Sequence, residues 1–204
     1  MLDRRHFAMG AGALALSAAG AARAQSSDEM FTLGAANAPL HLVEYASATC
    51  PHCAHFHETN WARLKSGYID TGRVRYTLRE MVTPPPPVAV AMFQVARCNG
   101  ADAAEYYRRL GILFERQRAI LSGGTMASVR DALFAIGAEW GLSNEQIWAS
   151  ITDQSGAARI QRSIQEASTR GVASTPTFYL NDQHQTDPAF LTPEGMAAIL
   201  DAAS

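Results

Sequence analysis

Patterns typical of β-strands lie only near the two ends of this chain, and a long stretch of helical patterns separates them. Leu40–Ala46 is short and apolar, Val74–Leu78 alternates apolar with polar residues, and Thr177–Leu180 is a third short apolar run. Between the second and third runs, from Val88 to Gln154, apolar residues recur at the spacing of one helix face. This order predicts an α/β fold in which one sheet domain is split by an all-helical insertion.

The first two strand patterns flank a helical pattern that runs to about Tyr68. A strand, a helix and a second strand in succession predict a βαβ unit with parallel strands and a right-handed crossover. Four consecutive prolines, Pro84–Pro87, follow the second strand, and they predict a stiff, extended connector.

Polar residues at the start of apolar stripes indicate where the later helices begin. Asp102, Thr125 and Ser143 are placed as N-caps of helices in the insertion, and Thr192 precedes a proline at the start of the last helix. We therefore assign residues 25–84 and 155–204 to the sheet domain and residues 85–154 to the helical insertion.

The first 24 residues are typical of an export signal. Arg4 and Arg5 form a short positive region, Ala8–Ala22 is apolar and uncharged, and Ala22-Arg23-Ala24 is a cleavage site of the small-x-small kind. The Arg4-Arg5 pair is also a partial match to a twin-arginine signal. We expect export to the bacterial periplasm, an oxidising compartment in which disulfides persist. The formal net charge of −2, with no basic stripe, gives no indication of nucleic-acid binding.

The Cys50-Pro51-His52-Cys53 sequence lies where the first strand ends and the helix begins. A C-x-x-C pair in this setting indicates a redox motif. Free N–H groups and the positive end of the helix dipole favour an anion at Cys50, so we expect its thiol pKa to be lowered. Pro51 suits the first helical turn, and His52 adds a donor, or a positive charge when protonated, beside the sulfur. Cys53, one turn along, is expected to be less exposed and to act as the resolving thiol.

A stabilised thiolate also indicates the direction of the reaction. Lowering the pKa of Cys50 favours the reduced, ionised form, so the disulfide is easily reduced and the protein acts as an oxidant. The sequence therefore predicts that the Cys50–Cys53 disulfide itself is the redox-active group, without a further cofactor.

Two other parts of the sheet domain contain candidate site residues. Glu44 lies on an apolar strand where the alternation points it inward, either as an ordinary structural carboxylate or as a buried acid that exchanges a proton with Cys53. Thr175-Pro176 precedes the third strand and is a candidate cis peptide. The backbone of Thr175 could bind an extended client there, as in strand addition.

A metal site is the alternative interpretation of the same cysteines. Cys50, Cys53, His55 and His57 could supply thiolate and imidazole ligands, although His55 points to a different face of the helix from His57. We expect His55 and His57 to be solvated or to lie at the active-site surface. Cys98, on an apolar stripe, is expected to be a buried small hydrophobe.

Together these motifs resemble the DsbA-like thiol:disulfide oxidoreductases of the bacterial envelope, which have the thioredoxin fold. The resemblance spans essentially all of residues 28–204. It implies that Cys50 attacks, that Cys53 resolves, that Glu44 is the buried acid of the family, and that Thr175-Pro176 is its cis-proline loop. Pro51-His52 is the dipeptide of strongly oxidising members.

The resemblance departs from the best-known oxidase at Thr175, where that enzyme has Val. Thr at this position is also found in isomerase and reductase relatives, so the direction of the reaction stays open between an oxidase and an isomerase or reductase. The family further implies reduced, unfolded exported polypeptides as clients and a DsbB-like membrane protein as the reoxidant. We expect a monomer, because the chain has no dimerisation stalk.

Overall fold

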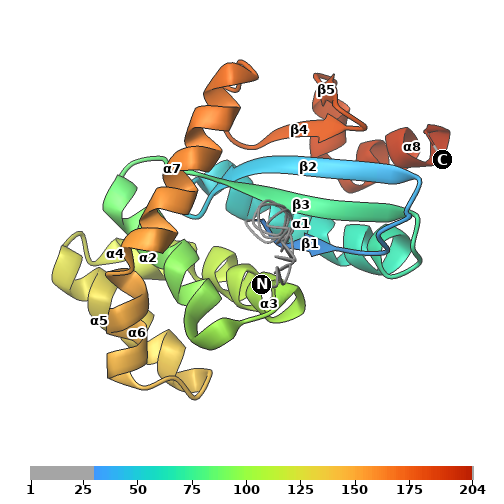
Figure 1. The fold of residues 1–204 in the computed structure, drawn as a ribbon. Coiled ribbons are helices and arrows are strands. Elements are labelled where there is room, and N and C mark those ends of the chain that lie inside the picture. Colours follow the sequence, from blue (N-terminus) through green and yellow to red (C-terminus); the bar gives the residue numbers. More distant parts are fainter. Residues whose placement is uncertain (1–29, 204) are drawn as a thin grey trace, which may run out of the picture.

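The computed structural model describes residues 30–203, and the predicted signal peptide lies outside them. These residues form a five-stranded sheet in the order β1-β3-β2-β4-β5, with helices packed against it (Figure 1). β2 and β3 are parallel, which confirms the predicted βαβ unit, and the other neighbouring pairs are antiparallel. The strands are β1 (Thr32–Leu33), β2 (Leu40–Ser47), β3 (Val74–Met81), β4 (Thr177–Leu180) and β5 (Gln183–Gln185).

The helices follow the order expected from the sequence, and the predicted N-caps are confirmed. Asp102, Thr125, Ser143 and Thr192 each accept a hydrogen bond from the backbone N–H three residues later. α2 to α6 lie within residues 85–154, the range assigned to the helical insertion. The domain boundaries themselves stay a prediction. The helical elements are α1 (Pro51–Leu64), the π-helix η1 (Lys65–Ile69), α2 (Pro86–Arg97), the 3-10 helix η2 (Cys98–Gly100), α3 (Ala103–Glu115), α4 (Gln117–Ser122), α5 (Met126–Glu139), α6 (Asn144–Ile151), α7 (Gln154–Thr169), the 3-10 helix η3 (Pro188–Leu191) and α8 (Pro193–Ala202).

The proline run differs from the prediction of an extended connector. Pro85 is extended and caps α2, but Pro86 and Pro87 form the first turn of that helix. The N–H groups of a first turn have no acceptor within the helix, so proline loses no hydrogen bond there, and its fixed φ angle suits the helix. The prediction is therefore wrong for Pro86 and Pro87.

The side chains of β2 alternate between two packed faces of the sheet. Leu42 and Ala46 belong to the main core, together with residues of α1 and α8. Val43 and Tyr45 pack on the other face, where α7 contributes Ala167. Glu44 shares the face of Leu42 and Ala46 and is completely buried, as its inward position in the sequence predicts. The fold thus places a carboxyl group inside the main core.

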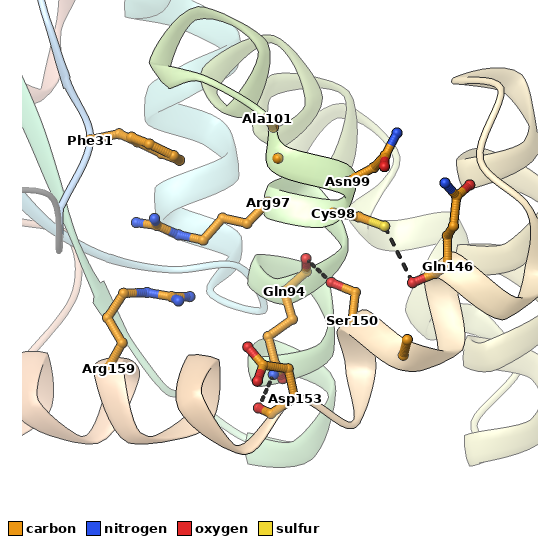
Figure 2. Close-up of a pocket in the computed structure, with 12 residues that line it drawn as sticks. Phe31, Gln94, Arg97, Cys98, Asn99, Ala101, Gln146, Ser150, Asp153 and Arg159 are labelled. Carbon is orange, nitrogen blue, oxygen red and sulfur yellow. Dashed lines mark hydrogen bonds between the residues drawn. The ribbon is translucent and has the colours of Figure 1, made fainter.

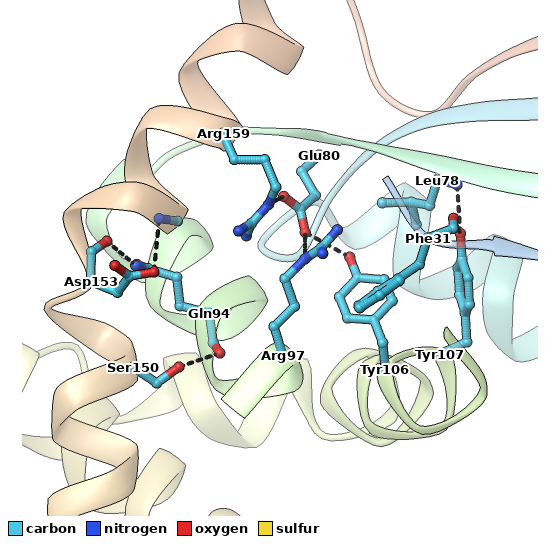
Figure 3. A network of polar contacts seen from close by, with 11 residues as sticks. Phe31, Leu78, Glu80, Gln94, Arg97, Tyr106, Tyr107, Ser150, Asp153 and Arg159 are labelled. Atoms are coloured by element: carbon cyan, nitrogen blue, oxygen red, sulfur yellow. Dashed lines mark hydrogen bonds and ion pairs between the residues drawn. The ribbon is translucent and has the colours of Figure 1, made fainter. Parts of the chain in front are cut away.

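A second buried carboxylate, Glu80 at the end of β3, joins the sheet to the helices (Figure 3). Its oxygens accept hydrogen bonds from Arg97 Nε at 2.9 Å, Arg159 Nε at 3.1 Å and the Tyr106 hydroxyl at 2.9 Å. These partners lie on α2, α7 and α3, so one side chain links three helices to one strand. The Arg97 guanidinium also lies over the Phe31 ring, 4.2 Å from its centroid.

No helix within residues 30–203 is long and apolar enough to cross a membrane.

Replacing Glu80 by Gln is expected to lower the free energy of unfolding by about 3–5 kcal/mol, because two largely buried guanidinium groups lose the carboxylate that both contact. Urea unfolding monitored by circular dichroism measures the change. The matched control is Glu139→Gln, which removes the exposed ion pair with Arg116 and should leave the midpoint almost unchanged. Equal midpoints for the two variants would contradict a structural role for Glu80.

Candidate active site

Cys50 is the N-cap residue of α1 and has an extended backbone, with φ −82° and ψ 119°. β2 ends three residues earlier, and Pro51 occupies the first helical position, as the sequence predicts. The sulfur therefore lies where the free N–H groups of the first turn are concentrated. Cys50 and Cys53 are not joined by a disulfide here, so the structure shows the dithiol form of the pair.

The surroundings of Cys50 lower its thiol pKa from 9.0 to about 5. The largest cause is a hydrogen bond from the Cys53 thiol, and smaller contributions come from the Thr175 side chain and from the backbone N–H groups of Cys53 and His52. Burial opposes these effects, since Cys50 is only 5% exposed. Hydrogen bonds thus outweigh desolvation, and at neutral pH the sulfur is a thiolate.

Cys53 has the opposite properties. It is 0% exposed, and burial is the largest cause of a raised pKa. Its hydrogen bond to Cys50 and the charge of Glu44 raise the pKa further. The pair is therefore asymmetric, with one ionised sulfur at the end of the helix and one protonated sulfur in the core.

Thr175-Pro176 lies against Cys50, which sequence reasoning alone could not place. The Cys50 thiol contacts the Thr175 carbonyl oxygen at 3.3 Å, across 125 positions of the chain. The Thr175-Pro176 peptide bond is cis, as the sequence suggested. β4 pairs with β2 directly after this bond, with Thr177 opposite Tyr45, and this pairing brings the loop to the end of α1.

Glu44 is the centre of a buried polar cluster beneath α1. Its Oε2 accepts hydrogen bonds from the Tyr76 hydroxyl and from His57 Nε2, the latter at 3.1 Å. Its Oε1 is buried and has no hydrogen-bond partner. Burial and the nearby Glu44 carboxylate hold the pKa of Tyr76 well above its usual value, so this hydroxyl stays a donor. A buried acceptor with one free oxygen, whose charge helps to raise the pKa of Cys53, is suited to exchange a proton with that thiol.

The expectation for His57 was wrong. Its residue exposure is 7%, and its ring stacks on Trp61 and on Phe114 of α3 instead of lying at the surface. A signal was present in the sequence, because residues four apart lie on the same face of a helix and His57 follows Cys53 by four. His55, by contrast, is on the exposed face, with its side chain 71% exposed.

Sequence reasoning also missed Gln117, at the start of α4. This buried side chain donates from Nε2 to the carbonyl oxygens of Ala48, at 2.8 Å, and of Cys50, at 3.0 Å. It therefore holds the loop between β2 and α1 from the helical part of the chain. No local pattern in the sequence marks this contact, because its two partners are backbone atoms 67 and 69 positions away.

The alternative metal site is not assembled by this geometry. His55 is exposed whereas His57 is bonded to Glu44, and within residues 30–203 no group of three or more His, Cys, Asp or Glu side chains is arranged to hold a metal ion. Pro51 and His52 are both exposed beside Cys50. The polar groups around Cys50 and Cys53 are thus hydrogen-bond donors, the Thr175 carbonyl oxygen and one buried acid.

Cys98 lies away from this site, in the wall of a cavity of about 520 Å³ between α2, α6 and α7 (Figure 2). It is buried, as expected, and its thiol donates to the Gln146 carbonyl oxygen at 3.3 Å. Burial raises its pKa, so Cys98 lacks the thiolate character of Cys50.

The fold and the cysteine pair define a class of protein, the thioredoxin-fold proteins with a C-x-x-C pair at the start of a helix. The family model described as "Thioredoxin" matches residues 25–202, and the chain belongs to this family.

Comparisons with individual proteins agree with this assignment. The chain is 30% identical over 155 residues to a Rickettsia prowazekii protein provisionally named as a protein-disulfide oxidoreductase, covering 76% of this chain and 55% of that protein. The chain thus spans about half the length of the curated relatives it matches.

Solved structures share the fold at low sequence identity. Wolbachia pipientis alpha-DsbA1 superposes with a TM-score of 0.72 at 21% identity, covering 85% of this chain and 90% of that one. A protein-disulfide isomerase from Novosphingobium aromaticivorans superposes with a TM-score of 0.67 at 23% identity, covering 85% and 98%. These findings confirm the predicted thioredoxin fold and the resemblance to DsbA-like proteins.

Thr175→Val should raise the pKa of Cys50 above its value of about 5, because the side chain at this position would no longer stabilise the thiolate. As the solution is acidified, the alkylation of Cys50 would then slow at a higher pH in this variant than in the unaltered protein, since only the thiolate reacts. Ultraviolet absorbance of the thiolate during a pH titration measures the shift. Thr169→Val, at an exposed position of α7, is the control. An unchanged titration curve for Thr175→Val would show that this hydroxyl has no influence on Cys50.

Proposed function

We propose that this protein is a thiol:disulfide oxidoreductase of the bacterial envelope that donates its Cys50–Cys53 disulfide to exported polypeptides through a mixed disulfide at Cys50. The observation that supports this most directly is the difference between the two sulfurs. The pKa of Cys50 is about 5, whereas that of the buried Cys53 is raised. A pair of this kind has one good leaving group and one thiol that is protected from solvent.

In the proposed reaction, a client thiolate attacks Cys50 Sγ of the disulfide form. A bond forms between the client sulfur and Cys50, the Cys50–Cys53 bond breaks, and the electron pair leaves on Cys53. Because its raised pKa disfavours the thiolate, Cys53 takes up a proton. A second client thiolate then attacks the client sulfur of the mixed disulfide, and Cys50 leaves as a thiolate. The client dithiol has lost two electrons and the protein disulfide has gained them.

The low pKa of Cys50 supports the oxidising direction. Above pH 5 the reduced form is stabilised by ionisation of Cys50, and this stabilisation is lost as the pH falls through about 5. At neutral pH the disulfide is therefore more easily reduced than one between ordinary thiols. Thr175 and Pro176, which lie against Cys50, are proposed to bind the client backbone near the reacting sulfur.

A disulfide isomerase or reductase of the same fold is the second candidate. Thr175 favours it, because Thr at this position also occurs in isomerase and reductase relatives, and the structural neighbour from Novosphingobium aromaticivorans is named as an isomerase. Both candidates use the same C-x-x-C chemistry, and they differ in the reduction potential of the Cys50–Cys53 disulfide.

The proposed clients are reduced or unfolded exported polypeptides, and a DsbB-like membrane protein is the proposed reoxidant. The signal-like residues 1–24 and the oxidising environment that a persistent disulfide requires support an envelope location. We propose that the protein acts as a monomer.

Cys53→Ala should accumulate a mixed disulfide between Cys50 and a client, because the resolving thiol is absent. The complex is detected by non-reducing electrophoresis and located by mass spectrometry after incubation with glutathione disulfide and a reduced peptide that carries a single thiol, so that no second client thiol can release Cys50. Cys50→Ala should form no such complex, and Cys98→Ala, away from the site, should behave like the unaltered protein. A complex formed through Cys53 or Cys98 would contradict the assigned roles.

Equilibration with glutathione should give a reduction potential closer to the DsbA end of the scale, about −120 mV, than to the thioredoxin end, about −270 mV. The reason is the stabilised Cys50 thiolate of the reduced form. The fraction oxidised is measured by mass spectrometry after acid quenching and alkylation. A value near that of thioredoxin would reject the oxidase assignment and favour a reductase.

A further inference from the structure

The buried Glu44 carboxyl group needs a connection to solvent if it serves Cys53. It lies inside β2, is 0% exposed, and one of its oxygens has no hydrogen-bond partner. In each reduction or reoxidation Cys53 gains or loses a proton, because its neutral form is favoured by burial. A buried acid that supplies this proton must in turn be recharged from water.

His57 is placed to make this connection. Its Nε2 lies 3.1 Å from Glu44 Oε2, on the inner side of the ring. Its other nitrogen, Nδ1, has no hydrogen bond to the described residues. The His57 side chain is 5% exposed, so the ring is within reach of solvent. The stacked rings of Trp61 and Phe114, with centroids 5.2 and 4.4 Å from the imidazole, hold the ring in this orientation.

We propose that His57 is a proton relay between solvent and Glu44, and that Glu44 passes the proton to and from Cys53. His57 acts through Glu44 and does not touch the sulfur atoms, so its role is that of a positioning residue. This inference rests on the proposed function, and it adds to it the path of the proton.

The steps balance over a complete redox cycle. When a client reduces the disulfide, the proton on His57 Nε2 moves to Glu44, Glu44 protonates the Cys53 thiolate, and water protonates Nδ1. The imidazole is then neutral with its proton on Nδ1. When the reoxidant arrives, Cys53 returns its proton through Glu44 to Nε2, and Nδ1 releases one to water. The second half of the cycle restores the first tautomer, so the buried ring never has to turn over.

Among residues 30–203, few titratable groups face His57 and Glu44. Tyr76 on β3 donates to the same Glu44 oxygen, and its raised pKa keeps it protonated. Tyr107 on α3 packs edge-on against Tyr76, and its hydroxyl donates to the Phe31 carbonyl oxygen at 2.7 Å. Cys53 is the group on α1, and Phe114 of α3 presents only a ring to the imidazole. A pH-dependent difference between the rates of the unaltered protein and of His57→Gln would therefore be assigned to His57.

A purely structural role for His57 would be the satisfaction of Glu44 by one hydrogen bond. His57→Gln separates the two roles, because glutamine keeps an N–H donor but cannot carry a proton. His57→Ala is the second variant, since it leaves a slot between Trp61 and Phe114 that imidazole from solution can enter. His55→Gln is the matched control, because it lies two residues away on the exposed face of the same helix.

The test is the single-turnover oxidation of a reduced dithiol peptide by the disulfide form of each variant, by stopped flow, from about pH 5 to pH 8, the range in which histidine titrates. His57→Gln should slow the reaction by at least about tenfold at neutral pH, somewhat less than the ~10²–10⁴-fold range of general acid–base catalysis. The ratio of its rate to that of the unaltered protein should also change with pH, because the ionisation of the client thiol affects both rates equally and cancels in the ratio. Imidazole should restore much of the rate of His57→Ala. The Cys50 titration and the rates of His55→Gln should stay those of the unaltered protein.

The inference is overturned if His57→Gln keeps the original rate and pH profile, or if its rate falls by the same factor at every pH. If His57→Gln does not fold, the His57→Ala variant decides: rescue by imidazole supports the relay, and its absence rejects it. An unaltered protein that fails to oxidise the peptide would reject the proposed function, and the relay with it. Normal oxidation by both the unaltered protein and His57→Gln would reject the relay alone.

Discussion

Cys50 and Cys53 are one helical turn apart, but their sulfur atoms are in opposite electrostatic environments, and much of the structure maintains this difference. Cys50 caps α1, where a hydrogen bond from Cys53 and the free backbone N–H groups stabilise its thiolate, with a smaller contribution from the Thr175 side chain. Cys53 is enclosed in the main core, where burial and the charge of Glu44 favour its thiol. The reduced form of such a pair is stabilised relative to its disulfide, because reduction places the negative charge on Cys50, whose surroundings favour a thiolate.

Three distant parts of the chain position this pair. β2 carries Glu44 on the buried face beneath α1, and β4 brings Thr175 to Cys50 by pairing with β2. Gln117 of α4 binds the carbonyl oxygens of the loop before α1. The hydrogen bonds and ion pairs of Glu80 attach α2, α3 and α7 to β3, which lies beside β2 in the same sheet. A polar group removed from the core at one of these points leaves its partners unsatisfied.

Much of the fold could be predicted because it depends on local patterns. The alternation along Leu40–Ala46 identified a buried strand and the inward position of Glu44, and polar residues before apolar stripes identified the helix starts. The errors arose where one local pattern has two outcomes. Consecutive prolines suit both an extended segment and the first turn of a helix, and Pro86 and Pro87 are in the helix. A histidine among polar residues suits a helix surface, but α3 covers that face of α1 and places Phe114 on the His57 ring.

The sequence by itself determined the cysteine pair at a strand–helix junction, the proline at the first helical position, the order of strands and helices, and the inward direction of Glu44, because each of these follows from spacing along the chain. Only the tertiary structure decided which groups surround the sulfurs: Thr175 against Cys50, His57 on Glu44, and Gln117 on the loop. The physical reason is that a thiol pKa depends on burial and on hydrogen bonds from whatever lies within a few ångströms. In this protein those neighbours include residues that sheet pairing and helix packing bring from as far as 125 positions away.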